Sequence, residues 1–158
     1  MDEITALKIL PKFEHIKIKT IRNNKREPLA HNRNICWKYS SGSIILFVDS
    51  DVEFIQEGFI NNIANNFFSD GCDLMAPLIY GAEGEIQSIG LKRIFNIPYI
   101  FRFCRNSSIE NEVVDMIHGA CFAVKKEIFS VVGGFHEVMS PYNFDEMDFT
   151  IRAKLKNF

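Results

Sequence analysis

A short, uninterrupted apolar run at residues 43–48 is the feature that most constrains the fold of this chain. It reads Ser-Ile-Ile-Leu-Phe-Val and is followed at once by Asp49, Ser50 and Asp51. A run of this length and composition predicts a strand buried on both faces of a parallel sheet. In open α/β sheets, ligands bind beyond the carboxyl ends of such strands. The run therefore predicts an α/β domain with two carboxylates at the ligand-binding edge.

Strand-like and helix-like segments alternate along the rest of the chain. Further strands are predicted over residues 15–21, 73–79 and 113–124, with a turn at 81–85, and helices over 29–39, 59–67, 125–132 and 144–155. This alternation predicts a layered α/β domain with a largely parallel sheet. A chain of 158 residues suffices for one domain with a real core, but not comfortably for two.

The composition argues against several classes of protein. A net charge of −2 lacks the basic excess that nucleic-acid binding needs, so no nucleic-acid partner is expected. The four cysteines are widely spaced, which predicts reduced thiols and neither a zinc site nor a disulfide framework. The acidic start does not resemble a signal peptide, and no apolar run approaches the roughly eighteen residues of a membrane span. We therefore expect a soluble, cytoplasmic protein.

Asp49 and Asp51 are the first candidates for chemistry. Two carboxylates one residue apart can point to the same side of an extended chain. They could then bind Mg²⁺ or Mn²⁺ through oxygen ligands, and the cation could hold substrate phosphates. The alternative is a pair of solvated turn residues, because Asp is common where strands end.

A second acidic cluster, Asp145, Glu146 and Asp148, begins the last predicted helix. Carboxylates in a first turn suit the positive end of the helix dipole, which is the plainer interpretation. The functional alternative makes one of them a general base toward an acceptor hydroxyl. Gly119, inside a strand-like run, indicates close approach of a ligand or backbone. His118 beside it has either a structural role or an acceptor contact.

Together, these pieces resemble the family-two glycosyltransferases, which have the GT-A fold. Residues 31–34 (His-Asn-Arg-Asn) are similar to that family's Arg-Asn-x-Gly helix, and residues 41–51 to its apolar strand that ends in Asp-x-Asp. Residues 84–90 (Gly-Glu-Ile-Gln-Ser-Ile-Gly) resemble rhamnosyltransferase-like members. Residues 119–152 are similar to its Gly-Ala, Gly-Gly-Phe-Asp-Glu and Glu-Asp-x-Asp-Leu motifs. Order and spacing agree over roughly residues 25 to 155.

On the donor side, the resemblance implies a nucleotide-diphosphate sugar bound with the help of Mn²⁺ or Mg²⁺. Asp51 would hold the cation on the diphosphate, and Asp49 would face the ribose or assist with the cation. Asn32 and Arg33 would lie near the nucleotide.

On the acceptor side, the resemblance implies that His118, Gly119 and Ala120 line the space beneath the sugar. Glu146 occupies the position of the family's base. Because the usual Glu-Asp order is reversed here, Asp145 is the alternative base. The implied reaction is a single in-line displacement with inversion.

The chain departs from the family pattern at its ends. Residues 1–11 contain neither the family's first strand, which ends in Pro-x-Tyr-Asn, nor its Asp-rich turn, and the sequence stops soon after Arg152. We therefore expect residues 1–158 to form one incomplete GT-A domain, a Rossmann-like mixed sheet flanked by helices. One alternative is a truncated domain that is inactive or depends on a partner. A weaker one is a haloacid-dehalogenase-like phosphatase with Asp49 as nucleophile and Asp51 as acid/base, which lacks its later Gly-Asp-x-x-x-Asp motif.

Residues 91–105 interleave aromatic and basic side chains. They predict either a variable loop that packs its aromatics inward, which we favour, or a peripheral contact with the inner face of an anionic membrane. The second interpretation would suit a lipid-linked acceptor, and a saccharide acceptor is equally open. Polysaccharide biosynthesis is the expected setting by analogy. The sequence does not identify the sugar or the oligomeric state.

Overall fold

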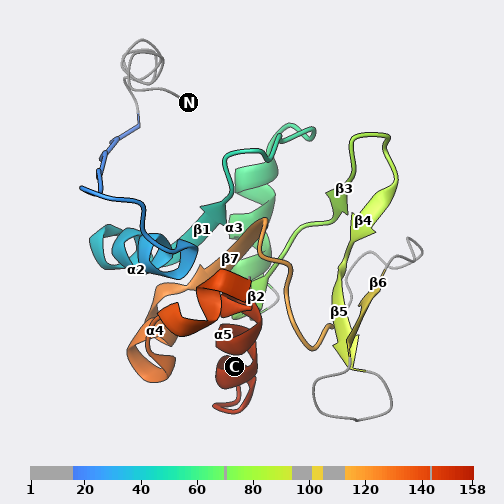
Figure 1. Ribbon diagram of the computed structural model, residues 1–158. Helices are drawn as coiled ribbons and strands as arrows, with labels where there is room; N and C mark the ends of the chain where they lie inside the picture. The colour runs from blue at the N-terminus through green and yellow to red at the C-terminus, as the bar shows by residue number, and fades with distance from the viewer. Residues whose placement is uncertain (1–15, 70, 94–100, 105–112, 143) are drawn as a thin grey trace.

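The computed structural model describes residues 16–69, 71–93, 101–104, 113–142 and 144–158 (Figure 1). The described part is a mixed α/β arrangement with one three-stranded sheet, two small hairpins and helices around the sheet (Figure 1). The order of elements is α2 (Leu29–Tyr39), β1 (Ile44–Val48), α3 (Phe59–Ser69), β2 (Leu74–Met75), β3 (Ile79–Tyr80), β4 (Ile86–Ser88), β5 (Gly90–Arg93), β6 (Phe101–Cys104), β7 (Cys121–Lys125), α4 (Lys126–Val132), the 3₁₀ helix η2 (Glu137–Tyr142) and α5 (Asp145–Lys154).

The sheet that carries the apolar run has the order β1-β7-β2, and both pairings are antiparallel. The expectation of a largely parallel sheet is therefore wrong for the described strands. Burial on both faces is confirmed only in part for β1. Ile45 and Phe47 are buried on one face, whereas on the other face Ile44 and Leu46 are partly buried against the α3 cluster and Val48 is 40% exposed. The doubly buried strand is β7, whose residues 121–124 are all buried. An apolar run predicts that a strand is buried. Which strand lies between two neighbours depends on where residues distant in the sequence pair with the sheet, and here β7 pairs with both β1 and β2.

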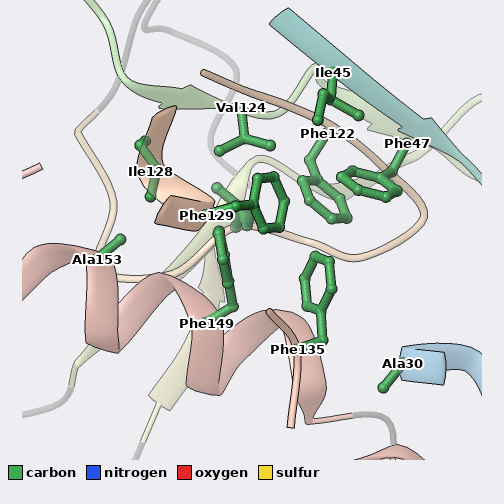
Figure 2. Packing of buried hydrophobic residues seen from close by; sticks show 11 residues of the cluster. Ala30, Ile45, Phe47, Phe122, Val124, Ile128, Phe129, Phe135, Phe149 and Ala153 are labelled. Carbon is green, nitrogen blue, oxygen red and sulfur yellow. The ribbon is translucent and has the colours of Figure 1, made fainter. Parts of the chain in front are cut away.

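The main core lies on the face of the sheet that α4 and α5 cover. Phenyl rings from β1, β7, α4 and α5 meet there, as Figure 2 shows, and Phe47 of β1 stacks on Phe122 of β7 at a centroid distance of 4.9 Å. The buried members of this cluster are Ala30, Ile45, Phe47, Ile117, Phe122, Val124, Ile128, Phe129, Phe135, Phe149 and Ala153. The opposite face packs Ala123 against Ile63 and Phe67 of α3. This core fixes the first turn of α5 relative to β1.

The helices agree closely with the sequence, because helical spacing is a local signal. The bounds of α2 are those predicted, and α3, α4 and α5 lie within two residues of the predicted ends. The predicted strand at 15–21 is wrong, since residues 16–21 form no strand and Ile16, Ile18 and Ile21 are exposed. An alternating pattern needs a neighbouring sheet edge, and no described strand pairs with residues 16–21. His15 lies outside the described residues.

The region between β2 and β7 contains two hairpins rather than long strands. The strand predicted at 73–79 is divided into β2 and the start of β3, with Pro77 between them. The predicted turn at 81–85 is confirmed, and Gly84 adopts a φ of 82° there. The strand predicted at 113–124 begins only at Cys121, after a single bridge between Met116 and Leu91.

Other sequence expectations concern membranes and thiols. No helix in the described ranges is long and apolar enough to cross a membrane. Cys36, Cys72 and Cys121 carry free thiols, and burial raises the pKa of Cys121 to about 11. Most of the aromatic and basic stretch at 91–105 lies outside the residues whose side chains are described, so both of its interpretations stay open.

Candidate active site

The guanidinium of Arg33 lies at the centre of the candidate site. Nη1 donates to Oδ2 of Asp145 at 3.0 Å and reaches Oε2 of Glu146 at 3.5 Å. Nη2 donates to the carbonyl oxygen of Gly119 at 2.8 Å and reaches Oδ1 of Asp49 at 3.5 Å. One side chain of α2 thus joins the end of β1, the segment before β7 and the first turn of α5.

Neighbouring residues hold α2 so that Arg33 points inward. Arg33 follows Ala30 by three residues, which places both on one helical face, and both are buried. Asn34 accepts a hydrogen bond from the Phe135 backbone at 2.8 Å and donates to the Phe135 carbonyl at 2.9 Å. Trp37, one turn along, stacks on Phe129 at 4.8 Å. These contacts tie α2 to the core independently of the ion pairs.

Asp49 and Asp51 follow β1, as predicted. The Asp49 backbone N–H donates to the Ala120 carbonyl at 2.9 Å, which fixes the end of β1 against the segment before β7. Burial raises the pKa of Asp49, Arg33 opposes this, and the negative charge of Asp51 adds to it. The side chain of Asp49 is 37% exposed, and Asp51 is exposed. Both carboxylates therefore stay open to solvent and to a bound molecule.

These two carboxylates are the candidate metal ligands. Among the described residues, no three or more His, Cys, Asp or Glu side chains group so as to hold a metal ion. Mg²⁺ commonly binds one or two carboxylates together with waters and substrate phosphates, so the donor set at 49–51 fits a cation that arrives with a diphosphate. It does not fit a cation held by protein ligands alone.

The carboxyl groups of Asp145 and Glu146 differ in their surroundings. Asp145 is fully buried, and its Oδ1 has no hydrogen-bond partner among the described residues. Glu146 is 7% exposed, and burial raises its pKa to about 7 although Arg33 acts in the opposite direction. Asp148 lies apart from this pair, bonded to Arg152 at 2.8 Å and His136 at 3.0 Å. The structure therefore separates the acidic cluster into two parts with different surroundings.

Gly119 leaves room for the carboxyl group of Glu146. A Cβ at this position would lie 2.7 Å from both Cδ and Oε1 of Glu146. The close approach expected at Gly119 is thus made by a side chain of this protein. His118 is half-buried beside it, and burial lowers its pKa while Asp49 acts in the opposite direction. Nδ1 of His118 accepts a hydrogen bond from the Ala120 backbone at 3.3 Å.

The two residues expected near the nucleotide, Asn32 and Arg33, have different surroundings. Within the described ranges, Asn32 accepts a hydrogen bond from Asn23 at 2.5 Å and forms none with the acidic groups around Arg33. Arg33, expected beside the nucleotide, is only 5% exposed and lies among protein acceptors. The sequence did not predict that Arg33 would lie at the centre of the acidic residues. The available signal was charge balance, because buried carboxylates from distant segments need a cation among them.

Comparison with known proteins identifies the family. The profile of glycosyl transferase family 2 matches residues 5–133, and the chain therefore belongs to this family. The match includes α2, the end of β1 and Gly119, begins upstream of the resemblance noted from the motifs, and ends before Asp145 and Glu146.

A relative from Sinorhizobium fredii, the uncharacterized protein y4gI, is 22% identical over 153 residues, covering 90% of this chain and 17% of the relative. The chain thus spans about a sixth of the length of the relative it matches. A comparison with solved structures gives no significant match.

Proposed function

We propose that this chain transfers a sugar from a nucleotide-diphosphate donor to an acceptor hydroxyl, with Glu146 as the general base. Membership of glycosyl transferase family 2 supports glycosyl transfer in general. The observation that carries the assignment of residues is the convergence of Asp49 and Glu146 on one buried guanidinium, that of Arg33. In the proposal, Asp49 is the donor-side carboxylate and Glu146 is the acceptor-side one, and their shared contact with Arg33 supports assigning them to one site.

Glu146 is the better candidate base of the two neighbouring carboxylates. Its pKa of about 7 lies near neutral pH, where a general base works best, and its side chain retains some exposure. Asp145 is fully buried and bonded to Arg33 at 3.0 Å, which keeps it from an acceptor. In the proposed step, the acceptor oxygen attacks the anomeric carbon and its proton passes to Glu146. The bond from that carbon to the diphosphate oxygen breaks, with inversion.

Asp51 and Asp49 are the proposed ligands of a divalent cation, Mn²⁺ or Mg²⁺. When bound, such an ion supplies stabilisation for the negative charge that develops on the departing diphosphate. Asp51 is exposed, whereas Asp49 contacts Arg33 through its side chain and the Ala120 carbonyl through its backbone N–H. In the proposal, Asp49 provides a ligand in a fixed position, and the side chain of Asp51 adjusts to the diphosphate.

A second candidate is a glycosyltransferase-like domain that depends on another chain or segment. Among the described strands, β1 lies at the edge of its sheet and pairs only with β7. An apolar edge strand is a template for a further strand, and such an addition would cover the exposed Val48. The phosphatase alternative has no support from the family match.

A donor-hydrolysis screen with Mn²⁺ tests the proposal. The purified chain is incubated with UDP-, GDP- and dTDP-linked sugars, and free nucleotide is measured for the wild type, Glu146→Gln and Asp51→Asn. Loss of a general base or of a metal ligand should lower turnover by about a hundredfold or more. Glu83→Gln, on the exposed β3–β4 turn, is the matched control and should keep full turnover. Full activity in Glu146→Gln would remove the proposed base.

A further inference from the structure

We infer that Arg33 is a positioning residue, which sets the place and orientation of the Glu146 carboxylate rather than binding the donor. The inference rests on the proposed function to the extent that Glu146 is the base. It goes beyond that function because the family resemblance implies that Arg33 lies near the nucleotide, whereas the inference makes Arg33 the residue that positions Glu146.

The geometry of the guanidinium supports this role. Its two Nη atoms reach acceptors in three segments that are distant in sequence, at 2.8 to 3.5 Å. The group also lies over the rings of Phe122 and Phe135, at 5.3 and 5.9 Å from their centroids. A planar fork held between rings and acceptors has a single orientation, which a lysine ammonium could not reproduce.

Glu146 is confined from two sides. Oε2 faces Arg33, and Cδ and Oε1 lie close to the α-carbon side of Gly119, where a Cβ would be only 2.7 Å away. The carbonyl oxygen of Gly119 is itself bonded to Arg33. Movement of the guanidinium would thus change both limits at once. With an exposed fraction of only 5%, Arg33 has little surface left for a nucleotide.

The charges around Glu146 come from several elements. Arg33 is contributed by α2, Asp145 by α5 itself and Asp49 by the end of β1, while His118 lies beside Gly119. Arg33 is the cation that opposes the rise in the Glu146 pKa, and Asp145 adds to that rise. A readout on Glu146 itself therefore reports whether Arg33 is in place.

The test is a ¹³C NMR titration of the Glu146 carboxyl group, with its signal assigned by its loss in Glu146→Gln. We expect a midpoint at about pH 7 in the wild type. In Arg33→Gln it should rise by about one unit or more, because an opposite charge at this range lowers a carboxyl pKa by about that much. Arg33→Lys, which keeps the charge, should restore part of the shift. An unchanged midpoint in folded Arg33→Gln would overturn the inference.

Arg152→Lys is the matched control. Arg152 is also an arginine whose guanidinium bridges several acceptors, namely Asp148 and the carbonyl oxygens of Val132 and Gly134, and Glu146 is not one of these acceptors. Its replacement should leave the Glu146 midpoint unchanged. A shift equal to that of Arg33→Gln would show that general loosening is the cause, which would overturn the inference.

A measurement on the wild type covers the case in which Arg33→Gln does not fold. The Nη protons of Arg33 should appear as separate, slowly exchanging signals, because both Nη atoms are bonded and buried. Averaged signals from a freely rotating guanidinium would contradict the inference. Neither NMR readout needs turnover, so an active Glu146→Gln enzyme would defeat the proposed base without deciding the role of Arg33.

Discussion

Gly119 and Glu146 are complementary in shape: the carboxyl group of Glu146 occupies the space where a side chain at position 119 would begin. Gly119→Ala should displace that carboxyl group, because a Cβ 2.7 Å from Cδ is closer than real contacts allow. A displacement near 1 Å at a reacting group can lower turnover by about a hundredfold, whereas the overpacking itself costs about 1–3 kcal/mol. Turnover of the best donor from the screen and urea denaturation measure the two effects.

Gly81→Ala provides the control for this substitution. There too an added Cβ would meet a glutamate carboxyl group, that of Glu85, but Glu85 is an exposed side chain that can move away. Turnover should therefore stay at the wild-type level. Equal losses in the two variants, or none in Gly119→Ala, would contradict the account of Glu146.

The pH dependence of turnover follows from the raised pKa of Glu146. A general base must be deprotonated, so turnover should fall about tenfold for each pH unit below about 7 and level off above it. The profile is measured with saturating donor and Mn²⁺ between pH 5 and 9. A plateau that extends down to pH 5 would show that the rate does not depend on a group with this pKa.

Stability should change with pH in the opposite sense. The Glu146 carboxyl group titrates at 4.5 in the unfolded chain and at about 7 in the folded one, so between these values the folded chain binds the extra proton. The free energy of unfolding therefore falls as pH rises through this window, by an amount on the order of 3 kcal/mol. Glu146→Gln lacks this titration, so its stability relative to the wild type should increase from pH 4.5 to 7 and stay constant above. Urea denaturation at several pH values tests this, and a constant difference would contradict it.

Arg33 and Asp145 should show strong coupling in stability. Arg33→Met leaves the fully buried Asp145 without its cation, which costs about 3–5 kcal/mol. Adding Asp145→Asn removes the stranded charge, so the double variant should be more stable than the sum of the two single losses predicts. Urea denaturation of the four proteins completes the cycle. Additive losses would mean that the pair does not interact across α2 and α5.

The helices and the end of β1 could be predicted because their signals are local. Helical spacing gave the bounds of α2, and a continuous apolar run placed β1 directly before Asp49 and Asp51. The direction of strand pairing could not be predicted in this way. Whether β1 pairs with a parallel or an antiparallel neighbour depends on where residues 121–125 return, and an apolar run is compatible with both.

The candidate site was predicted in its acidic members but not in its centre. Asp49, Asp51, Asp145 and Glu146 stand out as carboxylates at the ends of elements. Arg33 does not stand out, since one arginine in a helix is ordinarily a surface residue. Its role depends on contacts with residues 16 to 113 positions away, and no local pattern encodes such contacts.

The most direct test of one shared site is paramagnetic relaxation by Mn²⁺ along α5. Substoichiometric Mn²⁺ is added to ¹⁵N-labelled protein together with the nucleoside diphosphate of the best donor from the screen, with Mg²⁺ as the diamagnetic reference and Asp51→Asn as the control. If the cation binds at Asp49 and Asp51, the relaxation enhancement should be strong at the amide of Glu146 and decline steadily toward Lys154, and it should disappear in Asp51→Asn. Equal enhancement at both ends of α5, or a gradient in the other direction, would show that the two acidic groups do not share a site.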